Sequence, residues 1–199
     1  MFSIAIQAGG ESERMGQDKA LMPFLGEPLI QRVYQRMAPI ADEILVTTNN
    51  PKDYEFLNVS LHRDTIPNRG ALGGLYTALQ AASYPIVGVV ACDMPFASPE
   101  LLQAMRDTMQ NSELDLFIPQ TEVGLEPFHA VYRRETCLAA VKRAIDNDQW
   151  RLISWHHEVA VKVFPLEKVV RYDPEGLAFW NLNTPNEFRE AEGIARLRA

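Results

Sequence analysis

The segment from Gln7 to Lys19 carries residue types that bind phosphate groups. Gly9 and Gly10 permit a sharp turn that brings backbone N–H groups close to an oxyanion. Arg14 offers a planar set of donors for phosphate oxygens, and Lys19 supplies a mobile positive charge. The segment has neither the G-x-x-x-x-G-K-[ST] pattern of a P-loop nor the G-x-G-x-x-G pattern of a dinucleotide-binding loop. The residues alone leave two alternatives, a phosphate-binding loop of another kind and a glycine-rich surface turn.

An aspartate follows the most apolar run of the chain. Ile86–Ala91 is apolar at nearly every position, which predicts a central parallel strand that is buried on both faces. Asp93 lies just beyond the end of that strand, and Mg²⁺ binds to one or two protein carboxylates together with phosphate oxygens and water. We therefore expect Asp93 to hold magnesium, the alternative being an aspartate that turns the loop before Pro95. Cys92 is expected to pack as a small apolar residue.

Two more polar residues and a glycine pair follow the next predicted strands. Asn49 and Asp64 each come just after a strand, at the edge of an open α/β sheet where ligands bind. Either residue could instead cap its own backbone in a turn. Gly70–Leu75 opens a helix, and its glycines allow a base or a phosphate to approach the helix N-terminus. The alternative for these glycines is close packing of the helix against a strand.

Three motifs, in this order, resemble those of the molybdenum cofactor nucleotidyltransferases. They are Gly-Gly-x-Ser-x-Arg-Met-Gly-x-Asp-Lys after the first strand, Cys-Asp-x-Pro after the central strand, and Asn-x-Asn-Thr-Pro before the last helix. In that family the glycine-rich segment wraps the base and the phosphates, and the lysine contacts the triphosphate. The sequence departs from the family at Gln7, where an apolar residue is usual, and at Glu11, where a basic or small residue is common. The resemblance covers nearly the whole chain.

The resemblance assigns roles to individual residues. The catalytic residues that it implies are Arg14, Lys19 and Asp93, with Asp93 as the metal ligand. The nucleotide-binding residues that it implies are Gln7, Ala8, Gly9, Gly10, Lys19, Asn49, Asp64, Gly74 and Asp93. The acceptor-binding residues that it implies are Asn183, Asn181 and His129. The alternative for His129 is a structural role, which is common for a lone histidine on a strand.

The implied reaction is transfer of GMP from GTP to the phosphate of molybdopterin, with Mg²⁺ as cofactor and release of pyrophosphate. One alternative is a sister enzyme that uses CTP or that acts on a sugar or alditol phosphate. Another is a non-catalytic carrier that binds a nucleotide or the cofactor, although the intact Asp93 and Lys19 favour the enzyme. The implied partners are GTP and molybdopterin, with transient contacts to molybdoenzymes or their chaperones.

Other side chains have weaker claims on the acceptor. Positive or titratable groups that could face its phosphate are Arg133, Arg134, Arg151, His156 and His157. The alternative for each of them is a solvated surface position. The tryptophans Trp150, Trp155 and Trp180 are expected to pack in the core or at its rim rather than to stack on a pterin.

The elements that position these residues are strands that alternate with helices. Short apolar, β-branched runs predict strands at Ser3–Gln7, Glu43–Thr48, Val59–His62, Ile86–Ala91, Asp115–Pro119, Phe128–Arg133 and Val159–Phe164. Apolar spacing or caps predict helices over residues 29–37 and 72–79, after Ser98, and after Thr184, where Glu187 has the spacing of a capping box. Such alternation indicates an α/β fold with a three-layer, mostly parallel, doubly wound sheet. The resemblance makes this a Rossmann-like nucleotidyltransferase fold.

The chain is expected to form one domain. Residues 1–110 would be the nucleotide-binding half and residues 111–199 the acceptor-side half of this nucleotidyltransferase domain. Within the second half, Pro127–Arg133 and Val159–Tyr172 resemble irregular or antiparallel segments, and we expect them to form a small antiparallel addition on the substrate side.

Composition excludes several classes of protein. A formal net charge of −7 argues against non-specific binding of nucleic acid. No stretch approaches the roughly 18 to 20 apolar residues of a membrane span, and the first residues predict a strand rather than a signal peptide. The 2 cysteines lack the spacing of a zinc site or a disulfide framework, which favours a reducing compartment and a cytoplasmic location.

Overall fold

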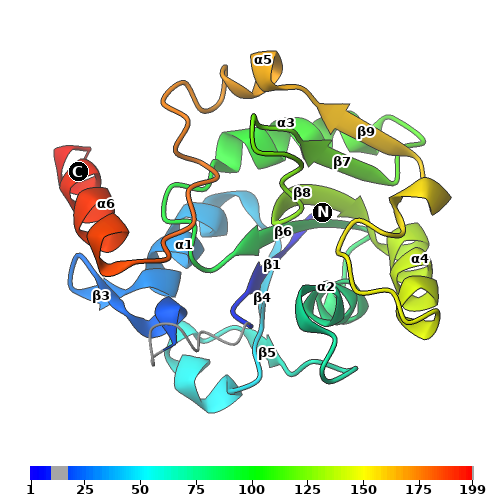
Figure 1. The fold of residues 1–199 in the computed structure, drawn as a ribbon, viewed down its shortest axis with the longest axis horizontal. Coiled ribbons are helices and arrows are strands. Elements are labelled where there is room, and N and C mark those ends of the chain that lie inside the picture. Colours follow the sequence, from blue (N-terminus) through cyan, green and yellow to red (C-terminus); the bar gives the residue numbers. More distant parts are fainter. Residues whose placement is uncertain (10–17, 199) are drawn as a thin grey trace.

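One seven-stranded sheet, in the order β5-β4-β1-β6-β8-β7-β9, forms the centre of the computed structural model, which describes residues 1–9 and 18–198 (Figure 1). The strands are β1 (Ser3–Gln7), β4 (Glu43–Thr47), β5 (Ser60–His62), β6 (Ile86–Ala91), β7 (Leu116–Pro119), β8 (His129–Arg133) and β9 (Val161–Phe164). All neighbouring strands pair in parallel except β8, which is antiparallel to both β6 and β7. A separate two-stranded antiparallel sheet consists of β2 (Pro23–Phe24) and β3 (Glu27–Pro28). The predicted fold class is confirmed.

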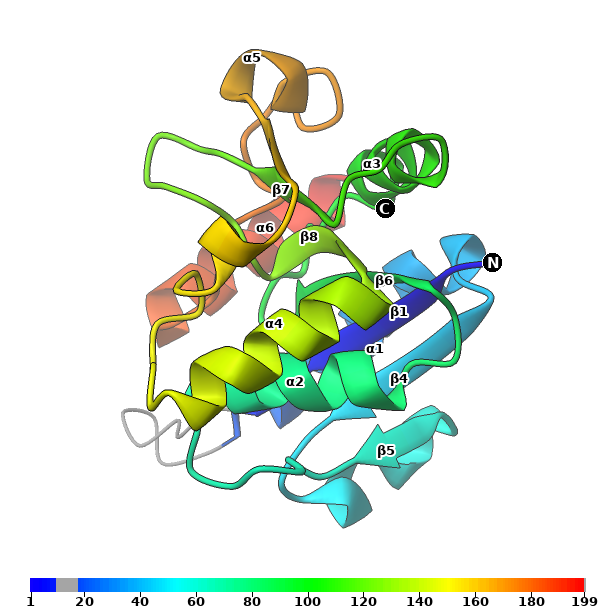
Figure 2. The same cartoon turned by 90° about the vertical axis from the view of Figure 1, so that its right-hand side faces the viewer.

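Helices cover both faces of the sheet and make three layers. The α-helices are α1 (Leu29–Met37), α2 (Gly70–Ala81), α3 (Pro99–Gln110), α4 (Arg134–Asp146), α5 (Leu166–Val169) and α6 (Pro185–Leu197). Short 3₁₀ helices are η1 (Lys19–Leu21), η2 (Ala38–Ile40), η3 (Pro51–Leu57) and η4 (His156–Glu158). Ile4 and Ile6 of β1 pack with α1 and α3, whereas Ala5 packs with α2 and α4. Figure 2 shows α2 and α4 side by side on their face of the sheet.

A third and smaller core holds the last helix. Leu182, Phe188, Ala191 and Ala195 pack against residues from the β2–β3 hairpin and the start of α1. The backbone N–H of Leu25 also donates to a carboxylate oxygen of Glu192 at 2.7 Å. The C-terminal segment therefore returns to residues that lie near the beginning of the chain.

The predicted strands and helices are all present, although several observed elements were not predicted, namely β2, β3, α4 and α5. β1 and β6 have the predicted bounds, and the other predicted strands differ from the observed ones by at most two residues at an end. The longest of these elements is α4, over residues 134–146. The buried residues of α4, which recur at helical spacing, are Cys137, Ala140, Val141, Ala144 and Ile145. That pattern is readable from the sequence alone.

The pairing of β9 differs from the expectation. Residues 159–172 were expected to be irregular or antiparallel, but β9 pairs in parallel with β7 along its whole length, from Leu116↔Val161 to Pro119↔Phe164. The antiparallel strand of the main sheet is β8, in line with the expectation for Pro127–Arg133. The direction of a strand depends on the route of the chain between strands, which apolar periodicity does not report.

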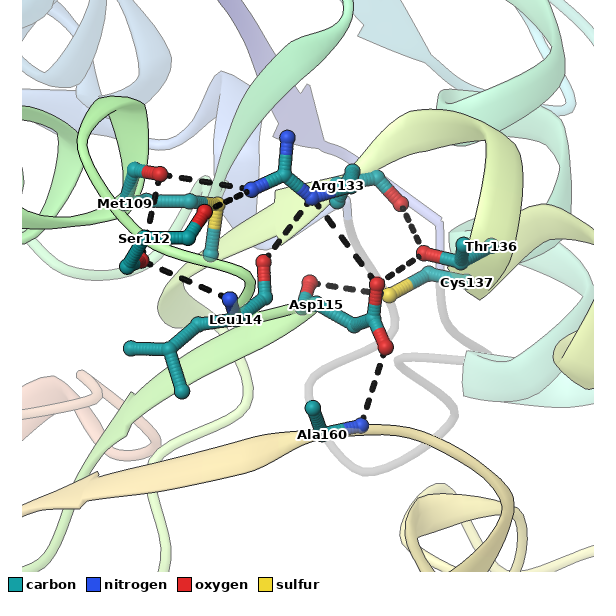
Figure 3. A network of polar contacts seen from close by, with 8 residues as sticks. All are labelled: Met109, Ser112, Leu114, Asp115, Arg133, Thr136, Cys137 and Ala160. Carbon is teal, nitrogen blue, oxygen red and sulfur yellow. Dashed lines mark hydrogen bonds and ion pairs between the residues drawn. The ribbon is translucent and has the colours of Figure 1, made fainter.

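A polar network fixes the edge of the sheet that lies opposite the carboxyl ends of the parallel strands (Figure 3). The Arg133 guanidinium donates to the carbonyl oxygens of Leu114 at 2.9 Å and Ser112 at 2.8 Å. The Asp115 carboxylate accepts hydrogen bonds from Thr136 Oγ1 at 2.6 Å and from the Ala160 N–H at 2.9 Å. The network joins the end of β8 to the segments that enter β7 and β9.

Within the described residues, no helix has both the length and the apolar character needed to cross a bilayer.

Candidate active site

A pocket of about 600 Å³ opens at the carboxyl ends of β1, β4 and β5 and beside the N-terminus of α2. Its lining residues are Gln7, Ala8, Gly9, Asp18, Thr47, Thr48, Asn49, Asn50, Asp64, Asn68, Gly70, Gly74 and Trp150. The volume is ordinary for a pocket that holds a small molecule. The structure thus brings together six of the residues that were expected to bind a nucleotide, namely Gln7, Ala8, Gly9, Asn49, Asp64 and Gly74. Gly10 and Arg14 lie outside the described residues.

The Gln7 side chain lies against the start of α2. A Cβ atom on Gly74 would be 3.1 Å from Gln7 Oε1 and 3.3 Å from Nε2, so only glycine leaves room for the amide. Gln7 is 7% exposed, and its Nε2 has no hydrogen-bond partner among the described residues. An unpartnered buried donor is unfavourable by about 1–3 kcal/mol. Gln7 therefore presents a donor that a ligand in this pocket can satisfy.

Asn49 and Asp64 meet across the ends of β4 and β5. Asn49 Nδ2 donates to Asp64 Oδ2 at 3.4 Å, and the Thr48 N–H donates to the His62 carbonyl oxygen at 2.8 Å. Burial raises the pKa of the Asp64 carboxyl, and the hydrogen bond from Asn49 opposes that rise. A carboxylate held in this way accepts hydrogen bonds from ligand hydroxyl groups.

A second group of residues, the Lys19 cluster of Lys19, Asp93 and Asn183, lies next to this pocket. Lys19 Nζ donates to Asn183 Oδ1 at 2.7 Å. The carbonyl oxygen of Asp93 accepts a hydrogen bond from the Leu182 N–H at 3.0 Å. Burial raises the pKa of the Asp93 carboxyl, while the positive charge of Lys19 acts in the opposite direction. The cluster thus combines a carboxylate and a cation, the two groups that phosphate and metal chemistry require.

Asp18 orients the segment that carries Lys19. It is the N-cap of η1, and its Oδ1 accepts from the Ala20 N–H at 3.1 Å. The hydroxyl of the buried Tyr54 donates to Asp18 Oδ2 at 2.5 Å. Asp18 belongs to the Gly-x-Asp-Lys part of the first motif, but neither it nor Tyr54 was assigned a role from the sequence. Tyr54 lies in η3, and no sequence signal pairs it with Asp18.

The predicted capping box at the start of α6 is present and holds Asn183. The Glu187 carboxylate accepts from the backbone N–H groups of Asn183 at 2.5 Å and Thr184 at 2.7 Å. Thr184 Oγ1 in turn accepts from the Glu187 N–H at 3.2 Å. Asn181 is linked to Lys19 through Asn183, since its backbone carbonyl oxygen accepts a hydrogen bond from Asn183 Nδ2 at 3.0 Å. The acceptor roles of Asn181 and Asn183 stay predictions.

His129 is fully buried, and its Nε2 accepts a hydrogen bond from the Ser98 N–H at 2.8 Å. Burial lowers the pKa of its imidazole to about 4, so the ring is neutral near pH 7. His129 therefore holds the N-terminus of α3, which is the structural alternative. The contact of His129 with an acceptor stays a prediction, and the buried position of the side chain does not support it.

Arg133 and Arg134 lie away from the pocket, and His156 carries no charge near pH 7. Because β8 is antiparallel, Arg133 is at the opposite edge of the sheet, in the network of Figure 3. Arg134 donates to the Leu79 carbonyl oxygen at 3.0 Å, near the end of α2. Burial lowers the pKa of His156 to about 4, so this side chain supplies no positive charge near pH 7. Burial also raises the pKa of the Cys92 thiol, as expected of a packing residue rather than a nucleophile.

Two of the three tryptophans pack as expected, and the third lies at the pocket. Trp155 is fully buried, and Trp180 stacks on Phe96 with ring centroids 6.2 Å apart. Trp150 is 59% exposed and lines the pocket, although it comes from the segment after α4. The expectation that Trp150 packs in the core or at its rim is therefore corrected, and no motif marks it as a pocket residue.

Comparisons with known proteins identify relatives of this chain. A family model described as a MobA-like NTP transferase domain matches residues 4–159. A molybdenum cofactor guanylyltransferase of Desulfosudis oleivorans is 30% identical over 192 residues, which cover 96% of this chain and 94% of that protein. A probable molybdenum cofactor guanylyltransferase of Natranaerobius thermophilus is 32% identical over 193 residues, with 95% and 94% covered.

A solved structure has the same fold over its whole length. The molybdopterin-guanine dinucleotide biosynthesis protein A of Archaeoglobus fulgidus superposes with a TM-score of 0.84 at 26% identity, covering 98% of this chain and 99% of that chain. The family model covers well over half of the chain, and the relatives cover nearly all of it. This chain therefore belongs to the family of MobA-like NTP transferase domains.

Proposed function

We propose that this protein is a molybdenum cofactor guanylyltransferase, which transfers GMP from GTP to the terminal phosphate of molybdopterin and releases pyrophosphate. The observation that carries the proposal is the Lys19 cluster beside a polar pocket at the carboxyl edge of the sheet, whose described lining residues include no lysine or arginine. Relatives named for this activity support the choice of substrates.

The distribution of charge supports one orientation of GTP. Among its described lining residues the pocket has 2 acids, Asp18 and Asp64, and no lysine or arginine. Such a pocket suits an uncharged nucleoside, with Asp64 placed to accept from ribose hydroxyl groups and Gln7 Nε2 placed to donate to the base. The triphosphate then points toward Lys19 and Asp93. Local cations outweigh the net charge of −7, because remote charges are screened by salt.

The residues present fit a magnesium ion that is bound together with the nucleotide. The described residues contain no group of three or more metal-binding side chains, and Asp93 is a single carboxylate beside the proposed phosphate position. Mg²⁺ suits such a site because it binds few protein ligands and completes its shell with phosphate oxygens and water. When bound, Mg²⁺ would neutralise charge on the phosphates. Asp93 would hold it.

The reaction needs positioning more than proton transfer. An oxygen of the molybdopterin phosphate forms a bond to the α-phosphorus of GTP, the bond from that phosphorus to the bridging oxygen breaks, and pyrophosphate leaves with the electron pair. The attacking oxygen is already anionic, so the step requires no general base. Lys19, held by Asn183, stabilises the negative charge that develops, and Asp18 keeps the lysine segment in place.

Nucleotide binding is the first test. Titration calorimetry with GTP, CTP, ATP and UTP, each with and without Mg²⁺, should show the tightest binding for GTP with Mg²⁺. Transfer to molybdopterin would then be measured as pyrophosphate release. A preference for CTP would change the product to that of a cytidylyltransferase, and binding of none of the four would contradict the proposal. Binding without transfer would indicate a carrier. The cytoplasmic location and the contacts with molybdoenzymes stay predictions.

A further inference from the structure

The pocket has one aromatic side chain among its described lining residues, and that side chain comes from a distant part of the chain. Trp150 follows α4, whereas the other lining residues come from the first 74 residues. In Figure 2, α4 ends beside the start of α2. Trp150 follows the last residue of α4 by four positions and lines the pocket. Trp150 is 59% exposed, so its indole ring offers apolar surface that a ligand in the pocket can cover.

The turn after α4 holds Trp150 in a defined place. Asp148 has φ of +54°, and its N–H donates to the carbonyl oxygen of Ile145 at 3.0 Å. The Gln149 N–H donates to the carbonyl oxygen of Ala144 at 2.9 Å. These bonds close the end of the helix in the manner of a left-handed C-terminal cap. The chain therefore leaves α4 in a fixed direction, two residues before the tryptophan.

Arg69, which immediately precedes α2, contacts the Trp150 ring and the turn after α4. Its Cζ lies 4.8 Å from the centroid of the Trp150 ring, and its Nη1 donates to Asp148 Oδ1 at 2.6 Å. Gly73 packs directly beneath Arg69, because a Cβ on Gly73 would lie 2.9 Å from Arg69 Cβ. The Arg69–Asp148 pair is too exposed to add much stability, with Asp148 75% exposed. Its effect is to orient a guanidinium over one face of the indole.

We propose that Trp150 stacks on the nucleobase of the bound nucleoside triphosphate and that Arg69, anchored by Asp148, orients the ring for this stacking. The inference rests on the proposed function, because it needs the nucleoside to occupy this pocket. Trp150 lines the pocket that is proposed to hold the nucleoside, whereas Lys19 and Asp93, which are proposed to face the triphosphate, are not among its lining residues. Stacking on an aromatic ring tolerates every base, so Trp150 contributes affinity, while base choice is left to polar groups such as Gln7.

The test compares three substitutions of Trp150 by calorimetric titration of GTP with Mg²⁺. Trp150→Ala should weaken GTP binding by about 10-fold or more, Trp150→Phe should keep most of the affinity, and Trp150→Leu should resemble alanine, because an aliphatic chain cannot stack. Arg69→Gln should have a smaller effect of about 3-fold, since the ring remains but is less well oriented. Phe56→Ala is the matched control, because Phe56 is 49% exposed and does not line the pocket.

Two further probes separate stacking from other causes. Inorganic tripolyphosphate lacks the nucleoside, so Trp150→Ala should leave its binding unchanged while GTP binding falls. Binding of GTP should quench tryptophan emission in the wild type and much less in Trp150→Phe, because Trp155 and Trp180 lie outside the pocket. If Trp150→Ala weakens the binding of GTP and of tripolyphosphate equally, the inference is overturned. Loss of molybdopterin affinity with unchanged GTP affinity would also overturn it and indicate a pterin contact.

Failure of the inference is distinct from failure of the proposed function. If the wild type binds GTP and Trp150→Ala binds it equally well, stacking is wrong and the guanylyltransferase stands. If the wild type binds no nucleotide, the proposed function fails, and with it the basis for the stacking.

Discussion

The nucleoside pocket and the Lys19 cluster are neighbours that are built in different ways. Most of the pocket comes from residues 7–74, which lie at the ends of β1, β4 and β5, in the segments that follow these strands, or in the first turns of α2. The Lys19 cluster instead depends on a contact between Lys19 and Asn183, which are 164 residues apart. The pocket is therefore a product of local strand ends, whereas the cluster exists only when the last helix docks.

The two regions also rest on cores of different size. The strands behind the pocket belong to the two large apolar clusters that sandwich the sheet. The segment with Asn183 is held by the small third cluster, with Leu182, Phe188 and Ala191 among its buried residues. Elements with few buried apolar contacts open at lower free energy than the core. Changes near α6 should therefore alter the Lys19 cluster without altering the pocket.

The largest effect is expected at Asp93, on the cluster side. Asp93→Ala should lower kcat/KM by about 10³-fold, because the carboxylate that holds the metal is lost. Burial raises the pKa of Asp93 in the free protein, and the ionised form is required. Because kcat/KM reports the pKa values of the free enzyme, it should fall with decreasing pH at a higher pH than for an exposed aspartate. Pyrophosphate release between pH 4 and pH 8 measures both.

The control for this change is stability. The pKa of Asp93 is higher in the folded state than in the unfolded chain, so the ionised carboxylate disfavours folding at pH values above the pKa of the unfolded chain. Asp93→Asn should therefore leave Tm at pH 7 equal to or above that of the wild type. A fall in both activity and Tm would indicate a structural aspartate instead.

The next largest effect is expected where the two ends of the chain meet. Lys19→Ala should lower kcat/KM by about 10²-fold through loss of charge stabilisation, and Asn183→Ala by about 10-fold through loss of one charge-assisted hydrogen bond. In the double variant the two effects should not add, with a coupling energy of about 1 kcal/mol. Strict additivity would show that Asn183 does not act through Lys19.

A smaller and opposite pair of effects is expected at Gln7, in the pocket. Gln7→Leu should stabilise the free protein by about 1 kcal/mol, because a buried unpartnered donor is replaced by an apolar side chain. It should also weaken GTP binding by about 5-fold, because one hydrogen bond to the base is lost. Urea unfolding and calorimetric titration measure the two effects. Unchanged GTP affinity would show that the amide does not contact the base.

The smallest effect is expected at the cap of α6. Thr184→Ala should destabilise the protein by about 1 kcal/mol, which corresponds to a fall in Tm of about 2–4 °C. Hydrogen bonds from backbone N–H groups lower the pKa of Glu187. The stabilisation of the folded state by the ionised Glu187 carboxylate is therefore present at neutral pH and is lost as pH falls through that lowered pKa. Thermal melts at pH 7 and pH 3 check the difference. Because the cap holds Asn183, turnover should fall while GTP affinity stays unchanged.

Residues at strand ends were predictable from the sequence because the signal is local. An apolar run predicts a strand, and the next polar residue lies at its carboxyl end, which is why Asn49, Asp64 and Asp93 could be named without a structure. The capping box of Thr184 and Glu187 is local in the same way. The apolar residues of α4, which recur at helical spacing, are an equally local signal, although no helix was predicted from them.

The sequence by itself determined the α/β class, the positions of most strands, and the polar residues at the edge where a ligand binds. Only the tertiary structure decided that β9 joins β7 in parallel, that Asn183 holds Lys19, and that Trp150 lines the pocket. The physical reason is that periodicity and capping depend on residues within a few positions of one another. Contacts between distant segments depend instead on how whole helices pack over the sheet, and α4 and α6 each carry a residue to the site only after that packing is complete.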